Sequence, residues 1–345
     1  MAGFFYAGRG ILDGCSAMIM SAGPTGDFRK KEDDEMGVLR LGHLELRVPN
    51  FDESVKYYTQ TIGLREMDRD AEKIYLKCFD EYDHHSVVLR KGDKTGLDHA
   101  GFKVEKSDDL AEFENKLEAR GIKVQRMANG EEHKLGEAIR FRLPTGQLIE
   151  LYASMEQPGR EVGHMNPEPW PRNRVGVNPY RLDHMLCGGQ DVSENIDIFQ
   201  NVLGFSISEQ VLGPDNETRI GAFMFRSNTA HDIAFLPYPE DHVFHHLAFW
   251  VEDKAEMIDT CDVLGRDNVP IEFGLDRHGI TRGLTTYFFD PAGNRNEVFS
   301  SSYLAQADMP VTTWTFDQIA GKGGRSMDRR TGLTESFLQT YTFAF

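Results

Sequence analysis

Two histidines and one glutamate in the second half of the chain could share a metal ion. His184 opens the stretch His-Met-Leu, His246 opens His-Leu-Ala-Phe-Trp-Val, and Glu297 ends a segment that begins at Pro291. Two imidazoles and one carboxylate on one face of an octahedral ion leave its other positions open, as a non-haem Fe(II) oxygenase requires for substrate and O2. Zinc hydrolases use the same ligand types, so the ligands alone do not identify the reaction.

Three further side chains in the same half could handle protons. His231 lies in Ala-His-Asp-Ile, between the two candidate ligand histidines, and His278 and Tyr287 lie shortly before the glutamate. An oxygenase that binds substrate and O2 at one metal needs nearby groups that exchange protons with the reacting oxygens and hydrogen-bond them. The sequence therefore places candidate acid–base groups next to candidate metal ligands.

These residues belong to segments that occur twice. Residues 43–63 match residues 184–204, and the offset of 141 positions is the same at both ends of the match. Residues 99–150 match residues 246–297 with a constant offset of 147 positions. Self-similarity of this extent indicates an internal duplication.

Each half divides again. His43, His99, His184 and His246 each open an alternating stretch, which is followed by a helical pattern and by short runs of β-branched and aromatic residues. Because alternate side chains of a strand share one face, histidines at two strand starts and a glutamate on a third strand can converge on one point. We predict an α+β protein of four βαβββ units, paired into two similar domains.

The periodic pattern also sets the expected domain boundaries. We predict a flexible extension over residues 1–35, whose apolar stretch is too short for a signal peptide. A first domain is expected over residues 36–165, a proline-rich linker over 166–178, a second, catalytic domain over 179–310, and a tail over 311–345.

Composition excludes several classes of partner. The 345 residues suit two domains, and a formal charge of −17 disfavours nucleic acid and anionic membranes, which require clustered basic residues. The four cysteines never form a Cys-x-x-Cys pair, which disfavours zinc knuckles, redox dithiols and disulfide frameworks. No run approaches the ~20 apolar residues that span a bilayer. We expect a cytoplasmic protein without a nucleic-acid or membrane partner.

One segment resembles the signature of a known family. Residues 278–297, which end in Phe-Phe-Asp-Pro-Ala-Gly-Asn-Arg-Asn-Glu, resemble the motif of the extradiol dioxygenases of the vicinal oxygen chelate (glyoxalase-like) superfamily. Asn-Pro-Glu-Pro-Trp-Pro-Arg at 166–172, Ala-His-Asp at 230–232 and Leu-Arg-Glu-Met-Asp-Arg-Asp at 64–70 narrow the resemblance to the catechol 2,3-dioxygenase (metapyrocatechase) group. The resemblance covers about residues 36–314.

The resemblance implies a metal centre and a reaction. It implies that His184, His246 and Glu297 hold Fe(II), with manganese as an open alternative. Of the neighbours His245 and His246, the second is chosen because it aligns with the other histidines that open units. The implied reaction is cleavage of catechol, or a simple substituted catechol, by O2 to 2-hydroxymuconate semialdehyde in aromatic catabolism. The implied assembly is a homotetramer.

The same resemblance implies roles for the remaining candidates. His231 would act as acid and base, and His278 and Tyr287 would hydrogen-bond the substrate hydroxylate and a dioxygen-derived oxygen. Two features depart from the family pattern, Thr286 and the tail after Thr315. Both are expected to bear on which catechol is preferred, whereas the reaction itself is expected to be unchanged.

The first half retains a formal copy of the ligand set in His43, His99 and Glu150. However, Arg140 aligns with Tyr287, and a cationic guanidinium beside a divalent ion would oppose it electrostatically. We therefore predict that the first domain is a metal-free relic.

Two other functions fit parts of the pattern. A glyoxalase-like isomerase resembles this fold but uses zinc or nickel and has a glutamate where His184 stands. A binding module of the bleomycin-resistance kind needs no metal and would leave His231, His278 and Tyr287 without a role. The histidine at 184 and these three residues favour the dioxygenase.

Overall fold

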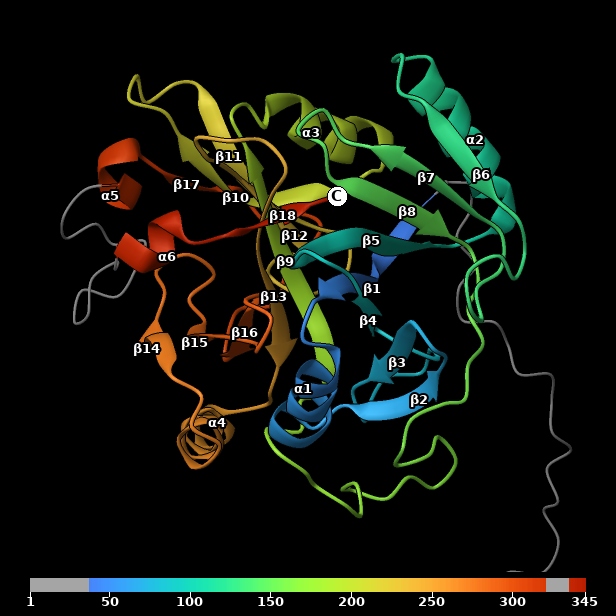
Figure 1. The fold of residues 1–345 in the computed structure, drawn as a ribbon. Helices are drawn as coiled ribbons and strands as arrows, with labels where there is room; N and C mark the ends of the chain where they lie inside the picture. The colour runs from blue at the N-terminus through green and yellow to red at the C-terminus, as the bar shows by residue number, and fades with distance from the viewer. Residues whose placement is uncertain (1–36, 321–334) are drawn as a thin grey trace, which may run out of the picture. The chain divides into compact units, whose positions relative to one another are not determined.

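The computed structural model describes residues 37–320 and 335–345, so the predicted flexible extension lies outside the described residues. The described chain forms four successive units, each a strand, a helix and three further strands (Figure 1). The predicted α+β fold of four βαβββ units is confirmed. None of the helices in the described ranges combines the length and apolar character that crossing a bilayer requires.

The first half, residues 38–152, contains two units that share one mixed sheet. The first unit comprises β1 (Val38–Val48), α1 (Phe51–Lys56), the π-helix η1 (Tyr57–Ile62), β2 (Arg65–Arg69), β3 (Lys73–Lys77) and β4 (Val87–Lys91). The second unit comprises β5 (Gly96–Val104), α2 (Ser107–Glu118), β6 (Val124–Met127), β7 (Ala138–Arg142) and β8 (Leu148–Tyr152). The first strands of the two units pair antiparallel, and each pairs parallel with the last strand of its own unit. The strand order is β2-β3-β4-β1-β5-β8-β7-β6.

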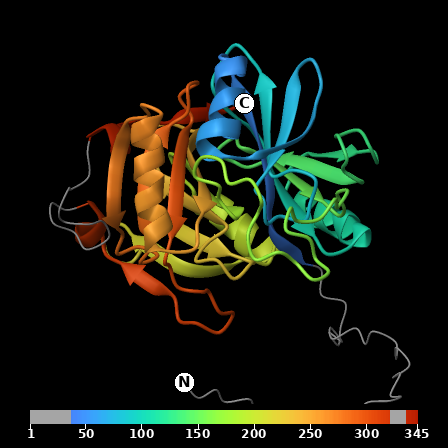
Figure 2. The same cartoon turned by 90° about the horizontal axis from the view of Figure 1, so that it is seen from below.

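The second half, residues 181–300, repeats this arrangement. The third unit comprises β9 (Arg181–Gly189), α3 (Ser193–Asp197), the π-helix η2 (Ile198–Val202), β10 (Ser206–Leu212), β11 (Arg219–Phe225) and β12 (Ile233–Pro237). The fourth unit comprises β13 (Val243–Trp250), α4 (Lys254–Arg266), β14 (Ile271–Arg277), β15 (Leu284–Phe289) and β16 (Arg295–Ser300). The strand order, β10-β11-β12-β9-β13-β16-β15-β14, is equivalent to that of the first half. Figure 2 shows α4, in orange, against the strands of its own unit.

The duplication extends to an irregularity of the backbone. The helix after β1 widens into a π-helix at Tyr57, and the helix after β9 does so at Ile198, the equivalent position. Both segments are followed by a glycine in the left-handed region, Gly63 at φ 87° and Gly204 at φ 74°, where a side chain would be strained. The two halves therefore inherited the same local geometry.

The two halves share one apolar core. Phe102 of β5 packs edge-on against Phe199 and Phe205 of the second half, with ring centroids 5.5 and 5.7 Å apart. The buried Gln147 amide donates to the carbonyl oxygens of Gly188 and Val243, at 2.8 and 3.1 Å. Since the two halves share buried contacts, the structure does not divide them into separate units. The predicted domain boundaries at 165 and 179 therefore remain a prediction.

The tail adds four short elements to the sheets. They are β17 (Thr312–Trp314), α5 (Phe316–Ala320), α6 (Glu335–Gln339) and β18 (Thr342–Ala344). β17 pairs with β10, whereas β18 pairs with β13 on one side and with β5 on the other (Figure 1). The last strand of the chain thus joins the sheets of the two halves.

Candidate metal centre

Strand register brings the three predicted ligands together. His184 on β9 and Glu297 on β16 are both register partners of Ala248, which lies between them on β13. His246 precedes this alanine by two residues on the same strand, so its side chain projects from the same face. Because Ala248 is small, the space above it is left to the three longer side chains. We call His184, His246 and Glu297 the metal centre.

The distances within the metal centre are short. His184 Nε2 lies 3.0 Å and His246 Nε2 lies 3.1 Å from the same oxygen, Glu297 Oε2. The two imidazole rings are almost perpendicular, at 82°, with centroids 5.6 Å apart. All three side chains are buried, and their ligand atoms lie within 4.8 Å of one another. The arrangement can close around a single ion.

A carboxylate behind His184 fixes its orientation. Asp183 Oδ2 accepts a hydrogen bond from His184 Nδ1 at 2.9 Å and another from Thr229 Oγ1 at 2.8 Å. Holding Nδ1–H in this way leaves Nε2 available to bind a metal. Burial favours the neutral ring, but Glu297 and Asp183 outweigh it and raise the pKa of His184 to about 9. A metal that binds here must therefore displace a proton.

His246 is oriented by its neighbour His245, to which the sequence alone assigned no role. A register shift between Phe244 and His246 makes His245 the extra residue of a bulge. Its Nε2 donates to the Phe337 carbonyl oxygen at 3.0 Å, and burial lowers its pKa, so its Nδ1 is an acceptor. The two Nδ1 atoms are 2.7 Å apart, so the hydrogen-bond pattern assigns the proton to His246 Nδ1. The only sequence signal for this role is the His-His pair itself.

The donor set fits a divalent transition metal. His246 Nε2 faces Glu297 Oε2 at 3.1 Å without hydrogen-bond geometry, as expected for two lone pairs that point at one ion. The other carboxylate oxygen, Glu297 Oε1, accepts a hydrogen bond from Thr285 Oγ1. Burial lowers the pKa of His246, which keeps its ring neutral and able to coordinate.

A cavity opens beside the metal centre, and His231 lies on its wall. The His231 ring lies 4.0 Å from the His184 ring, between centroids, and is tilted by 41°. Neither of its ring nitrogens has a hydrogen-bond partner among the described residues. Burial holds the pKa of His231 well below its usual value, so the ring is neutral and can accept a proton.

His278 and Tyr287 line the same cavity and contact one another. His278 Nε2 lies 3.1 Å from the Tyr287 hydroxyl, and the Tyr287 ring lies 5.3 Å from the His246 ring. Tyr287 is the register partner of Glu297. Burial and the Glu297 charge raise the pKa of Tyr287 well above its usual value, so the phenol stays a hydrogen-bond donor. The structure thus brings all six predicted site residues to one place.

The remaining cavity wall is mainly apolar, as suits a flat aromatic ligand. Its apolar and aromatic side chains are Leu186, Phe223, Leu236, Tyr238, Ile280, Phe299, Ile319, Phe337 and Leu338, and His245 and Thr281 add two polar ones. Of the two departures from the family pattern, only the tail reaches this wall, through α5 and α6. Thr286 does not line the cavity; its Oγ1 lies 4.0 Å from Cys261 Sγ.

Buried Arg295 holds α6 over the cavity. Its Nη1 donates to the Thr340 carbonyl oxygen at 2.7 Å, and its Nε forms an ion pair with Glu272 at 2.6 Å. Glu272 also accepts a hydrogen bond from Ser336 Oγ at 2.6 Å. The motif that supplies Glu297 therefore also secures the tail.

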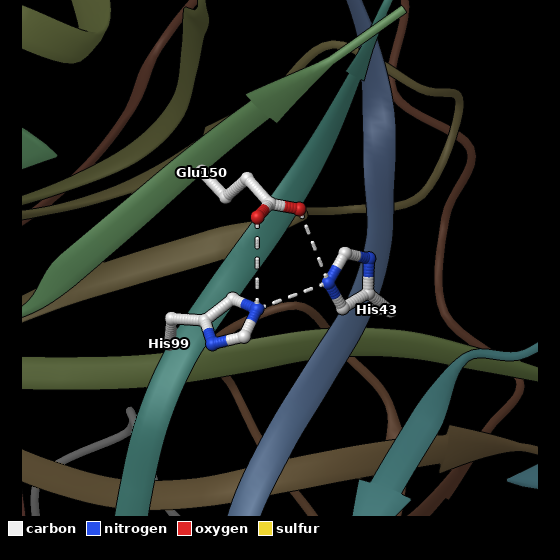
Figure 3. Close-up of side chains that lie close together, drawn as sticks. All are labelled: His43, His99 and Glu150. Atoms are coloured by element: carbon white, nitrogen blue, oxygen red, sulfur yellow. Dashed lines mark hydrogen bonds and ion pairs between the residues drawn. The ribbon is translucent and has the colours of Figure 1, made fainter. Parts of the chain in front are cut away.

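The first half contains a second convergence of the same residue types, which we call the upstream copy (Figure 3). His43 Nε2 lies 3.3 Å from His99 Nε2 and 3.4 Å from Glu150 Oε1, and His99 Nε2 lies 3.9 Å from Glu150 Oε2. Gly101 takes the place of the central alanine, and an added Cβ there would meet the His43 ring at 2.1 Å. The strand geometry of the metal centre is therefore repeated.

Comparison with known families identifies both halves. Residues 97–156 match the catechol 2,3-dioxygenase-like N-terminal domain. Residues 181–298 match the glyoxalase/bleomycin resistance protein/dioxygenase superfamily.

Individual relatives agree with this assignment. The chain is 40% identical over 308 residues to a metapyrocatechase of Pseudomonas sp. (strain CF600), with 89% of this chain and 99% of that protein covered. It is 31% identical to a manganese-dependent 2,3-dihydroxybiphenyl 1,2-dioxygenase of Geobacillus genomosp. 3, with 77% and 86% covered. The crystal structure of the 2,3-dioxygenase LapB from Pseudomonas sp. KL28 superimposes with a TM-score of 0.79 at 39% identity, with 82% and 99% covered.

Proposed function

The chain belongs to the extradiol dioxygenases of the glyoxalase/bleomycin resistance protein/dioxygenase superfamily, and we propose that it opens the ring of catechol or a simple substituted catechol at a mononuclear Fe(II). His184, His246 and Glu297 hold the metal in this proposal. The observation that carries it is the convergence of these three buried donors beside an apolar cavity that also contains a neutral histidine. One catechol and one O2 together contain all the atoms of 2-hydroxymuconate semialdehyde. The reaction therefore requires no external reductant.

The donor set suits Fe(II) and Mn(II) alike. Of the two ions, we propose Fe(II). When bound, Fe(II) would lower the pKa of a coordinated catechol hydroxyl and give the diol and O2 one meeting point. The manganese-dependent relative makes manganese the alternative to test. Metal analysis of the purified protein, together with activity after reconstitution with each ion, distinguishes the two.

His231 is proposed to move the proton of the reaction. Its unpartnered nitrogens and neutral ring suit it to accept a proton from a catechol hydroxyl in the cavity. The protonated ring can then return that proton to an oxygen that gains negative charge as the ring opens. The adjacent His184 ring, 4.0 Å away between centroids, keeps this exchange next to the metal centre.

Tyr287 and His278 are proposed to orient the oxygens. The raised pKa of Tyr287 keeps its hydroxyl protonated, so it can donate a hydrogen bond to a deprotonated substrate oxygen. His278 Nε2, 3.1 Å from that hydroxyl, restricts the direction in which the tyrosine points. A fixed donor of this kind stabilises developing charge without rearranging during the reaction.

The apolar wall is proposed to bind the substrate ring and exclude water. Phe223 and Phe299 lie on the strands around the metal centre, whereas Phe337 and Leu338 reach the cavity from α6. A flat ring held between such side chains presents its two oxygens to the polar end of the cavity. The tail would then limit the size of ring substituents.

Assembly and location follow the same resemblance. We propose a homotetramer that acts in the cytoplasm. Light scattering during size-exclusion chromatography tests the assembly, because a tetramer has four times the mass of the chain.

Anaerobic reconstitution tests the proposed function. Metal-free protein is loaded with Fe(II), mixed with catechol and exposed to air, and the yellow ring-opened semialdehyde is followed by its absorbance. We expect colour from the wild-type protein and none from Glu297→Ala, with Glu150→Ala of the upstream copy as the matched control. Absence of colour with every simple catechol, or full activity of Glu297→Ala, would contradict the proposal.

A further inference from the structure

The upstream copy differs from the metal centre at one position next to its glutamate. Between β15 and β16, Tyr287 is the register partner of Glu297. Between β7 and β8, the register partner of Glu150 is Arg140. A guanidinium thus stands where the metal centre has a neutral phenol.

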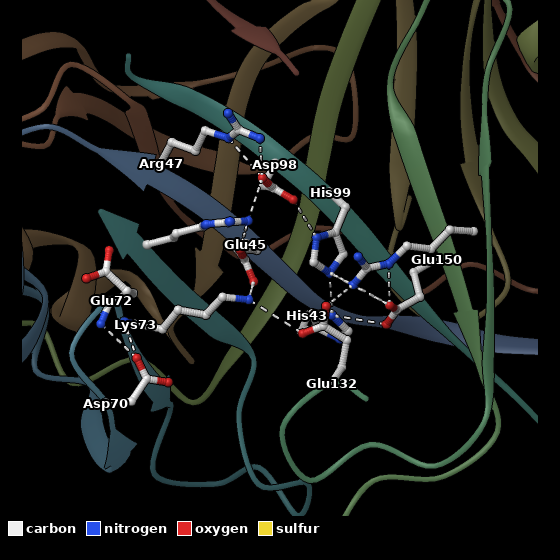
Figure 4. Close-up of polar contacts among 12 residues, drawn as sticks. His43, Glu45, Arg47, Asp70, Glu72, Lys73, Asp98, His99, Glu132 and Glu150 are labelled. Atoms are coloured by element: carbon white, nitrogen blue, oxygen red, sulfur yellow. Dashed lines mark hydrogen bonds and ion pairs between the residues drawn. The ribbon is translucent and has the colours of Figure 1, made fainter. Parts of the chain in front are cut away.

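The Arg140 guanidinium contacts two of the three ligand side chains, His99 and Glu150, which Figure 4 labels together with their neighbours. Its Nη2 lies 2.7 Å from Glu150 Oε2 and 3.2 Å from His99 Nε2. Its Nε lies 2.8 Å from the same Glu150 oxygen. Because a guanidinium only donates hydrogen bonds, it uses the atoms of Glu150 and His99 that a metal would bind.

Surrounding side chains hold this arrangement in place. Arg140 Nη2 also donates to Glu132 Oε1 at 2.7 Å. On the opposite side, Asp98 Oδ1 accepts from His99 Nδ1 at 3.1 Å, and Asp98 is in turn held by Arg47 at 2.6 Å. His99 therefore directs its Nε2 towards Arg140, in the same way as His184 directs its Nε2 towards Glu297.

The guanidinium also balances the charge of a buried carboxylate. Glu150 is fully buried, and a carboxylate in that environment requires a nearby cation. Its second oxygen, Oε1, has no hydrogen-bond partner among the described residues and faces His43 Nε2 at 3.4 Å. The donors that Arg140 does not use are therefore still arranged as ligands.

We propose that Arg140 replaces a divalent metal ion in the upstream copy, and that His43, His99 and Glu150 form a latent site for a divalent transition metal that loss of Arg140 opens. The guanidinium supplies the positive charge that the carboxylate requires and repels a second cation. Two nitrogens and one carboxylate oxygen match the donors of the metal centre, so the opened site takes the same class of ion. One residue thus decides which half of the duplication binds metal.

Counting metal ions per chain tests the proposal. Metal-free wild-type protein, Arg140→Ala and Arg140→Tyr are equilibrated with Co²⁺ without oxygen, freed of unbound ion, and analysed for cobalt by mass spectrometry. We expect each variant to hold one more ion per chain than the wild type. Because the result is a difference between proteins, it does not depend on whether the metal centre works as proposed.

Two matched variants assign the additional ion. Arg142→Ala changes an exposed arginine on the same strand and should leave the metal count at the wild-type value. Arg140→Ala combined with His43→Ala should lose the additional ion, because His43 belongs to the upstream copy and not to the neighbouring group Glu45, Asp98 and His99. This double variant also separates the upstream copy from the partly exposed group Asp68, His84 and His133, whose ligand atoms likewise lie within 4.8 Å of one another.

Thermal unfolding provides a second measurement, which needs the metal-free variant to be folded only at the starting temperature. Co²⁺ should raise the Tm of Arg140→Ala more than that of the wild type, because an ion bound only by the folded state stabilises it. The additional rise should vanish in the double variant. Equal metal counts in the wild type and both Arg140 variants, or an additional ion that persists without His43, would overturn the proposal.

Discussion

The metal centre on β9, β13 and β16 and the upstream copy on β1, β5 and β8 use equivalent strands in equivalent register, yet their histidines are supported differently. In the metal centre an aspartate supports His184 on β9, the first ligand strand. In the upstream copy an aspartate supports His99, which lies on the second ligand strand. Opposite the glutamate, one copy has Tyr287 and the other has Arg140. The two copies thus share a ligand set and differ in the groups around it, which is where we propose that the difference in metal binding arises.

The space beside the two sites differs as well. Phe299 of β16 leaves a cavity beside the metal centre. The equivalent Tyr152 of β8 lies 5.3 Å from the His43 ring and is packed so closely that a Cβ at Gly42 would meet its hydroxyl at 1.9 Å. His231 is open to the cavity, whereas His85 at the equivalent position is paired with its neighbour at 3.1 Å. The metal centre thus has open volume beside its ligands, whereas Tyr152 packs against the ligands of the upstream copy.

The largest effect should come from removing the glutamate of one copy at a time. Glu297→Ala should reduce turnover far beyond the roughly 100-fold loss typical of an outer-shell change, because it removes a ligand. Glu150→Ala should keep the activity but lower the folding free energy by less than the about 3–5 kcal/mol of an uncompensated buried charge, since Arg140 loses one buried carboxylate and keeps Glu132. Steady-state kinetics and urea unfolding measure the two effects. Loss of activity in Glu150→Ala would break the comparison.

The next largest effect should come from changing His231, which we propose transfers the proton. His231→Asn should lower kcat by about 10²–10⁴-fold, the usual contribution of a positioned acid–base group, and leave the bound metal unchanged. His85→Asn is the matched change in the first half and should leave kcat at the wild-type value. Kinetics and metal analysis of both variants provide the check, and a His231→Asn protein without metal would show that the residue acts on binding instead.

A smaller effect is expected at the aspartates behind the histidines. Asp183→Asn should weaken metal binding by about 10–100-fold, because the carboxylate fixes the orientation and basicity of His184. Asp98→Asn changes the equivalent support in the upstream copy and should not alter the affinity. Competition with a chelator measures both proteins. Equal losses would mean that the upstream copy also contributes to the bound metal.

The smallest effect should appear at the tail, whose α5 and α6 reach the cavity beside the metal centre. Phe337→Ala should raise KM for catechol by about 10-fold or more, as expected for one side chain removed from an apolar pocket, and improve the relative rate with bulkier catechols. Phe316→Ala, on the partly exposed face of α5, is the control and should change neither value. An unchanged KM for Phe337→Ala would show that α6 does not contact the substrate.

Much of this organisation could be predicted from the sequence. The four units and the duplication were predictable because each unit opens with a histidine and the offsets are constant, and strand alternation then brought His184, His246 and Glu297 to one face. The role of His245 was not predictable, because it depends on a bulge that local sequence does not mark. The position of Phe337 depends on contacts with distant strands, which no local pattern reveals.

The most direct test of the central claim is anomalous diffraction at the iron edge from crystals loaded with Fe(II) under anaerobic conditions. One peak is predicted between His184, His246 and Glu297, and none among His43, His99 and Glu150. Iron in the upstream copy, or a metal centre without a peak, would contradict the account.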